Sequence, residues 1–166
     1  MEGIDPVRTV EIDGWKLGIR FSSSHLLAHH NKCSRLHGHT YVVKLKVKGG
    51  LNDQWMVVDF GELKETLREI ISEMDHRLLL PGKSTTMKIE LGVDYVEVEN
   101  EGRFYRIPKE DVLILPVEAT TAESLSAYIL KRLLQRYPAL MDMVEVALGL
   151  DEGWGQGAWS VWRGGQ

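Results

Sequence analysis

Apolar and polar residues alternate along several stretches of the chain, which is the pattern of strands with one buried face. In the clearest stretch Val43, Leu45 and Val47 alternate with three lysines. A pair of glycines follows and ends the run, because glycine weakens a strand. The predicted strands are 15–21, 43–47, 55–58, 144–148 and 158–162.

Two other stretches place apolar residues three and four positions apart, the spacing of a helix with one buried stripe. The first covers 62–74. The second opens at Thr120 or Thr121 and ends at Tyr137, because Pro138 cannot continue a helix.

Between the helices lies an insertion of about 83–117, within which 95–98 and 103–107 flank the turn-forming segment 99–102 and predict a hairpin. Without it, and apart from the short strand 55–58 that leads into the first helix, the order is two strands, two helices and two strands. This order predicts an α+β fold, with two helices on one face of a four-stranded antiparallel sheet. We expect one domain over 1–166, because 166 residues suit a single core.

Composition excludes several classes of protein. No 18-residue apolar window is present, so we expect no membrane span, and 1–10 lacks the apolar core of a signal peptide. The single cysteine, Cys33, cannot form an internal disulfide, which fits the cytoplasm. A net charge of −4 argues against a nucleic-acid partner, which would need a clustered basic surface.

Three histidines fall on the buried faces of two predicted strands. Side chains two residues apart share a face, so the row that contains Phe21 extends to His25, and the row that contains Val43 extends back to His39 and His37. A His-x-His pair alone is more often a surface or hydrogen-bonded pair. Three imidazoles that converge from a buried face suit a catalytic zinc site, whose fourth position stays open, as well as they suit hydrogen-bonded histidines.

The segment Cys33-Ser34-Arg35-Leu36-His37-Gly38-His39 resembles the signature of the 6-pyruvoyl-tetrahydropterin synthase / 6-carboxytetrahydropterin synthase family, which has the tunnelling fold (T-fold). Four more segments resemble that family in the same order. They are Phe21-Ser22-Ser23-Ser24-His25, Val57-Val58-Asp59-Phe60-Gly61-Glu62-Leu63-Lys64, Asp75-His76 and Thr120-Thr121-Ala122-Glu123.

The resemblance implies zinc (Zn²⁺) bound by His25, His37 and His39. It also implies 7,8-dihydroneopterin triphosphate as the substrate, with active sites between the subunits of a homo-hexamer built as a dimer of trimers. One late glutamate would anchor the pterin; we choose Glu152, and Glu145 is the alternative.

The resemblance further implies that Cys33 is the general base. A lone cysteine is more often a small buried side chain, but Cys33 has polar neighbours on both sides. Asp75 and His76 would form an acid–base pair, although a histidine at a helix end can simply favour the helix dipole. Thr121 is a candidate substrate contact, while Thr120-x-x-Glu123 has the form of a capping box.

Three reactions occur among the proteins that this chain resembles. One eliminates triphosphate and gives 6-pyruvoyl-tetrahydropterin. A second also releases acetaldehyde and gives 6-carboxy-5,6,7,8-tetrahydropterin, on the route to queuosine, and we predict this reaction. The third is similar to dihydroneopterin aldolase and uses a glutamate near the cysteine position, but no acidic residue lies between Cys33 and His37. A pterin-binding module without catalysis is the remaining alternative.

Overall fold

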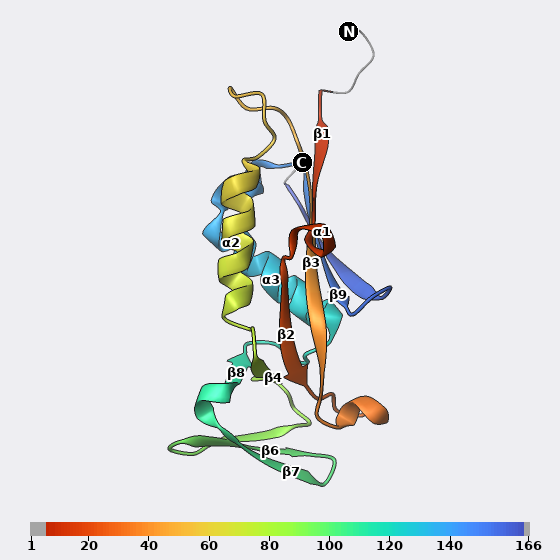
Figure 1. Cartoon of the computed structure of the whole chain (residues 1–166), viewed down its shortest axis with the longest axis vertical. Helices are drawn as coiled ribbons and strands as arrows, with labels where there is room; N and C mark the ends of the chain where they lie inside the picture. Colours follow the sequence, from red (N-terminus) through yellow and green to blue (C-terminus); the bar gives the residue numbers. More distant parts are fainter. Residues whose placement is uncertain (1–5, 165–166) are drawn as a thin grey trace.

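The computed structural model describes residues 6–164 (Figure 1), so part of the N-terminal stretch assessed above, 1–5, lies outside the described residues. The strands are β1 Arg8–Asp13, β2 Arg20–His25, β3 His37–Gly49, β4 Arg77–Pro81, β5 Lys88–Leu91, β6 Tyr95–Asn100, β7 Arg103–Pro108, β8 Val112–Leu115, β9 Glu145–Glu152 and β10 Gly157–Arg163. The α-helices are α1 Gly14–Leu17, α2 Phe60–Ser72 and α3 Ala122–Arg136, and short 3₁₀ turns cover Lys32–Ser34, Lys109–Asp111 and Pro138–Asp142.

The main sheet has seven strands in the order β10-β9-β3-β2-β4-β8, with β1 paired to the other end of β3. The α+β class is therefore confirmed, but the prediction of a four-stranded, purely antiparallel sheet is wrong. The two strands β4 and β8 pair in parallel, β4 with β2 and β8 with β4. Alternation could not reveal β4, because Leu78, Leu79 and Leu80 are all buried and no polar side chains interrupt them.

A short helix interrupts the strand that we predict over 15–21. The Asp13 carboxylate accepts a hydrogen bond from the Trp15 backbone N–H, and Gly18 ends the turn at a φ of 65°. Gly14 lies so close to β3 that a Cβ would be 2.0 Å from the Val43 carbonyl oxygen, which explains a glycine there. The alternation is therefore coincidental before Arg20 and real after it.

The short strand predicted at 55–58 is also wrong. Trp55 is 82% exposed, and its φ of 63° is incompatible with a strand. The segment is a turn that ends at Asp59, whose carboxylate caps α2 by accepting hydrogen bonds from two backbone N–H groups. The two long helices themselves are close to their predicted ranges.

The helices α2 and α3 pack on one face of the main sheet and bury a large core with it (Figure 1). We call this the main core. It contains the inward-facing side chains of β2, β3 and β9 together with the apolar stripes of both helices. Its strand members include Phe21, Tyr41, Val43, Leu45, Val47, Leu79, Val146, Leu148 and Leu150.

The insertion contains more than the predicted hairpin. The strands β6 and β7 form that hairpin around Glu101 and Gly102, whose φ values of 51° and 74° suit a tight type I′ turn. The strand β5 adds a third strand to them, which makes a separate inserted sheet, β5-β6-β7. A small core lies beneath this sheet and consists of Leu26, Leu78, Leu80, Met87, Val96, Val98 and Val112.

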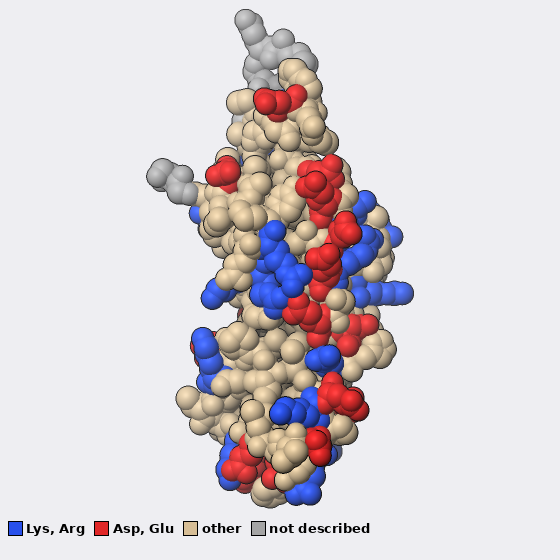
Figure 2. Space-filling model, turned by 90° about the vertical axis from the view of Figure 1, so that its left-hand side faces the viewer, with Lys and Arg blue, Asp and Glu red and all other residues tan. Residues whose placement is uncertain are grey.

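The surface carries charges of both signs. Figure 2 shows basic and acidic side chains side by side on one face, with no large area of a single sign. Arg132 and Arg136 of α3 pair with Glu73, and Arg136 also pairs with Glu69. No helix within residues 6–164 is long and apolar enough to cross a membrane.

Candidate metal centre

The three predicted histidines meet where β2 ends and β3 begins. His25 and His37 are direct partners in the antiparallel ladder, and His39 lies two residues further along the same face of β3. Each histidine offers one ring nitrogen, and these three atoms lie within 4.8 Å of one another. His25 is buried, and the other two are half-buried. The group is therefore close enough to hold one metal ion.

Backbone carbonyls fix the orientation of two of the rings. The Thr120 carbonyl lies 2.8 Å from Nδ1 of His25, and the Arg35 carbonyl lies 2.7 Å from Nδ1 of His37. A carbonyl only accepts, so each Nδ1 carries the proton and each Nε2 keeps a lone pair. A hydrogen bond from the ring nitrogen that does not bind the metal is typical of metal-binding histidines.

The resulting arrangement of lone pairs fits a cation. The Nε2 atoms of His25 and His37 are 3.1 Å apart, so in the neutral rings two acceptors face each other. The buried Nε2 of His39 has no hydrogen-bond partner among the described residues. Buried polar atoms rarely remain without partners, and one metal ion would satisfy all three nitrogens.

The electrostatic environment keeps His25 neutral. Burial is the largest effect and lowers the pKa of His25 from 6.5 to about 4. The Thr120 carbonyl and the Glu152 carboxylate oppose this shift, while His37 and His39 add to it. A neutral imidazole is the form that binds a metal.

The Glu152 carboxylate lies beside the histidines. Its Oε1 is 3.5 Å from Nε2 of His25 and 3.6 Å from Nε2 of His39, and it accepts a hydrogen bond of 3.2 Å from the Tyr41 hydroxyl. Burial and this carboxylate raise the pKa of Tyr41. Glu145, the alternative, begins β9 and pairs with Arg163 at 3.2 Å. Of the two glutamates, the structure brings Glu152 to the histidines.

Cys33 lies in the 3₁₀ turn of the loop between β2 and β3, where it is half-buried. Its sulfur does not belong to the set of mutually close ligand atoms formed by the histidines. The thiol is thus not part of the candidate ligand set, although its loop joins the two strands that carry the histidines.

Asp75 and His76 form a close pair, but not at the end of a helix as expected, because α2 ends at Ser72. Nδ1 of His76 is 2.9 Å from the Asp75 carboxylate, whose other oxygen accepts from the Ser22 backbone N–H at 2.7 Å. Burial alone would raise the pKa of Asp75, but these contacts lower it overall. Within residues 6–164 no hydrogen bond or ion pair joins His76 to the three histidines. The His76 side chain is 83% exposed.

The residue that caps α3 is Thr121, whose hydroxyl accepts from the Ser124 backbone N–H. The capping box that begins at Thr120 is therefore wrong, and the two adjacent threonines differ in role. Thr120 is fully buried, its hydroxyl has no partner among the described residues, and its carbonyl orients His25.

Sequence reasoning missed the groups behind the histidines. The Thr120 and Arg35 carbonyls belong to the backbone, so no side-chain pattern announces them. Tyr41 was within reach of the argument, because it continues the row of His37 and His39 on β3 and therefore faces the same site.

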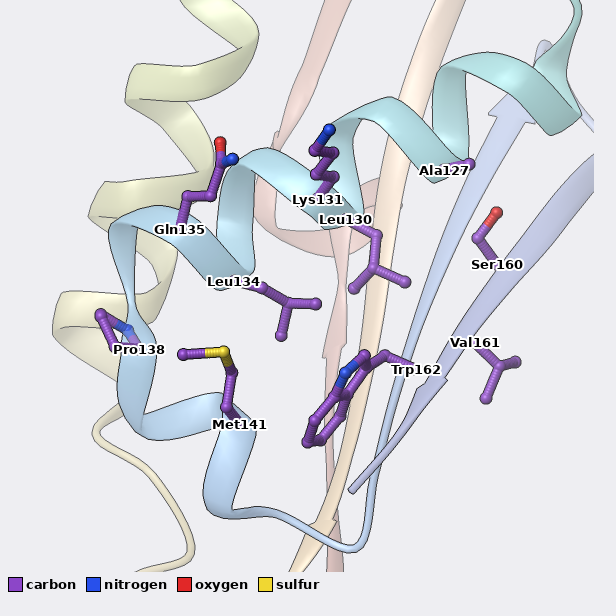
Figure 3. A pocket seen from close by; sticks show the side chains of 10 residues that line it. All are labelled: Ala127, Leu130, Lys131, Leu134, Gln135, Pro138, Met141, Ser160, Val161 and Trp162. Atoms are coloured by element: carbon purple, nitrogen blue, oxygen red, sulfur yellow. The ribbon is translucent and has the colours of Figure 1, made fainter. Parts of the chain in front are cut away.

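An apolar hollow of about 590 Å³ lies away from the histidines, between α3 and β10 (Figure 3). In Figure 3 Leu130 and Leu134 border it from α3, Met141 from the 3₁₀ turn after that helix, and Trp162 from β10. No titratable pair converges there, so we do not place chemistry in it.

Comparison with known proteins identifies the family to which this chain is similar. The model of the family described as 6-pyruvoyl tetrahydropterin synthase matches residues 16–152. A relative from Methanocaldococcus jannaschii, named as a candidate 6-carboxy-5,6,7,8-tetrahydropterin synthase, is 37% identical over 154 residues, which cover 90% of this chain and 93% of the relative. A relative from Pyrococcus horikoshii with the same name is 33% identical over 79% of this chain and 80% of its own length.

Among solved structures, the 6-pyruvoyl tetrahydropterin synthase of Plasmodium falciparum superposes with a TM-score of 0.88 at 26% identity, over 96% of this chain and 99% of the other. Structures of the Plasmodium vivax protein match equally well, and two of these are described as mutants of a catalytic glutamate.

Proposed function

Since this chain belongs to the 6-pyruvoyl tetrahydropterin synthase family, we propose that it converts 7,8-dihydroneopterin triphosphate to 6-carboxy-5,6,7,8-tetrahydropterin and releases acetaldehyde and triphosphate. The observation that carries the proposal is the cluster of His25, His37 and His39, whose nitrogens lie within 4.8 Å of one another. The names of the archaeal relatives favour the carboxy product.

We propose zinc as the metal, because three imidazole ligands that leave a fourth position open are typical of catalytic zinc. When bound, zinc supplies Lewis acidity that stabilises negative charge on a coordinated substrate oxygen. Thr120 and Arg35 hold the rings of His25 and His37 through their carbonyls, so the lone pairs need no reorientation when the metal arrives.

The remaining roles belong to Cys33, to the Asp75–His76 pair, to Glu152 and to Thr121. Cys33 would take a proton from the substrate's side chain as the general base. His76 would transfer protons, and the Asp75 carboxylate at 2.9 Å would hold its ring in one tautomer. Glu152 would accept hydrogen bonds from the pterin ring, with Tyr41 holding the carboxylate in place. Thr121 would contact the substrate through its backbone, because its hydroxyl caps α3.

Glu152 has a second possible role, as a further metal neighbour, because its oxygen is 3.5 Å from His25 and 3.6 Å from His39. The two roles separate in Glu152→Gln. A pterin anchor predicts a raised KM with normal metal content, whereas a ligand predicts weaker metal binding. We favour the anchor, since a fourth protein ligand would close the site.

We further propose that the chain assembles as a hexamer, with His76 acting on a substrate bound at a neighbouring chain's histidines. Within residues 6–164 the strand β10 ends the main sheet, and its side chains Trp159 and Val161 are each 43% exposed. Free edges and exposed apolar side chains favour pairing between subunits. The exposure of His76 fits a role at another chain's site.

The decisive experiment incubates the zinc-loaded protein with 7,8-dihydroneopterin triphosphate and identifies the products by mass. Carboxy-pterin with acetaldehyde supports the proposal. Pyruvoyl-pterin would assign the triphosphate elimination, and a hydroxymethyl-pterin would assign the aldolase-like reaction, which the absence of an acidic residue between Cys33 and His37 disfavours. If the protein turns over no more substrate than a His37→Ala control, the result would support a pterin-binding module without catalysis.

A further inference from the structure

The tip of the inserted sheet is bonded to the loop that carries Cys33. This loop, 26–36, joins β2 to β3, and the tip consists of residues 100–103. The Asn100 side chain donates to the Leu27 carbonyl at 3.3 Å and to the Ser34 carbonyl at 3.0 Å. Arg103 donates to the Ser34 hydroxyl at 3.2 Å. Glu101 accepts a hydrogen bond from the His29 backbone N–H at 2.7 Å.

Asn100 is the buried member of this contact. It ends β6 and continues the inward-facing row of Val96 and Val98, and all three are only 1% exposed. A buried amide is costly without hydrogen bonds, and Asn100 makes them through its Nδ2 group, while its Oδ1 has no partner among the described residues. The two N–H bonds of Asn100 both reach carbonyl oxygens of the loop, and turning the amide over would set oxygen against oxygen.

The two carbonyls belong to residues next to Cys33, one in sequence and one through a backbone hydrogen bond. Ser34 follows Cys33 directly, and the Leu27 backbone N–H donates to the Cys33 carbonyl at 2.7 Å. Within the loop the Ser34 backbone N–H also bonds to the His30 carbonyl at 2.8 Å. Asn100 therefore bonds to both ends of the loop, at Leu27 and at Ser34, on each side of Cys33 in the sequence.

We propose that Asn100 is a positioning residue for the reaction, and that the inserted sheet serves to hold the Cys33 thiol at one place relative to the three histidines. The inference rests on the proposed role of Cys33 as the base. Small displacements of a catalytic group cost large factors in rate, so loss of the Asn100 amide acts on turnover through Cys33. Loss of the Arg103 side chain should lower turnover in the same way but by less, because Arg103 is half-buried and bonds only to the Ser34 hydroxyl of the loop.

The test compares Asn100→Ala with Val98→Ala. Val98 is the neighbouring inward residue of β6, so its truncation loosens the small core without removing a bond to the loop. Arg103→Ala serves if Asn100→Ala fails to fold. Cys33 is the only cysteine of the chain, so the rate of alkylation by iodoacetamide reports its position independently of turnover. Zinc content, kcat, KM and the alkylation rate are measured for each variant.

We expect Asn100→Ala to lower kcat by roughly 10–100-fold with nearly normal KM and zinc content, and to speed alkylation several-fold. Val98→Ala should change neither kcat nor the alkylation rate, even if it lowers the melting temperature as much as Asn100→Ala does. In the Cys33→Ala background, Asn100→Ala should cause no further loss of kcat, because both act through one thiol.

Two failures can be told apart. If Cys33→Ala retains normal kcat, the role of Cys33 in the proposed function is overturned, and the role of Asn100 in turnover with it. If Cys33→Ala lowers kcat but Asn100→Ala keeps both kcat and alkylation rate at wild-type values, only the positioning role is overturned. Equal losses in Asn100→Ala and Val98→Ala would also overturn it, since they would report general loosening of the small core.

Discussion

The main core and the small core share one strand and bury opposite faces of it. In β4, Leu79 faces the main core, whereas Leu78 and Leu80 face the small core, and all three are at most 4% exposed. The main core combines one sheet face with two helices, while the small core lies between β4 and the inserted sheet. The insertion is therefore a cover for the second face of β4 and not a loose appendage.

In both cores a row of inward-facing side chains ends in a polar residue. In β2 the row runs from Phe21 to His25, and in β6 it runs from Val96 to Asn100; both polar residues are 1% exposed. His25 meets the other histidines, and Asn100 meets the loop that carries Cys33. The comparison teaches that a polar residue that completes a buried row deserves inspection as part of a site.

The largest expected effect is on the metal. His37→Ala removes one of three ligands, and we expect zinc content to fall from about one per chain to near zero, with turnover lost. His29→Ala is the matched control, because His29 contacts Glu101 at the inserted sheet and not the cluster. Metal analysis of the two purified variants provides the measurement. Full zinc in His37→Ala would contradict the ligand assignment.

The next effect concerns Cys33. In Cys33→Ala we expect kcat to fall roughly 10²–10⁴-fold, the usual contribution of a positioned general base. Zinc content should remain normal, because the candidate ligands are all imidazoles. Steady-state kinetics and metal analysis on one preparation test this. A lowered melting temperature with nearly normal kcat would mean that Cys33 only packs.

A pair of leucines tests whether the two cores unfold together. Leu79→Ala and Leu80→Ala truncate neighbouring residues, each fully buried, on opposite faces of β4. Because the strand is shared, we expect each to lower the free energy of unfolding by roughly 2–5 kcal/mol. All five tryptophans lie outside 83–117, and Trp162 packs against the main core, so tryptophan fluorescence in urea follows the main core and not the inserted sheet. An unchanged tryptophan transition in Leu80→Ala would show that the small core unfolds separately.

The row of histidines was predictable because β3 is long and regular. Its alternation fixes which side chains share a face from Val47 back to His37, and the antiparallel partner β2 then brings in His25. Parity within each strand was enough to place the three side chains on one face, even though the beginning of the first predicted strand was wrong, while the choice of a metal site also needed the family resemblance.

Other features leave no such pattern. The strands β4 and β8 are short apolar runs, which a single sequence does not separate from other buried segments. Contacts such as that between Asn100 and Ser34 join residues 66 positions apart and depend on how the inserted sheet folds over β4. Two adjacent threonines could each cap α3, and only packing decides between Thr120 and Thr121.

Acid should destabilise the metal-free protein. Burial lowers the pKa of His25 to about 4, below its ordinary 6.5, so the folded state binds fewer protons than the unfolded state between these values. The contribution to stability is therefore complete above pH 6.5 and is lost as the pH falls toward 4. It amounts to about 3 kcal/mol at most. The urea midpoint of chelator-treated protein should fall as the pH is lowered from 6.5 to 4, and His25→Gln should weaken this dependence of the midpoint on pH. Equal slopes in both proteins would contradict the assignment.

The smallest effects separate the two threonines between β8 and α3, where the chain passes from the small core to the main core. Thr121→Ala removes the cap of α3, which should cost about 1 kcal/mol. Thr120→Val removes a buried hydroxyl without a partner among the described residues while it keeps the shape, so we expect no loss or a slight gain. The carbonyl that orients His25 remains in both variants, so metal content should not change. Thermal unfolding of the metal-free proteins measures the pair. A larger loss of stability in Thr120→Val than in Thr121→Ala would mean that Thr120 caps α3, as the capping-box pattern in the sequence suggests.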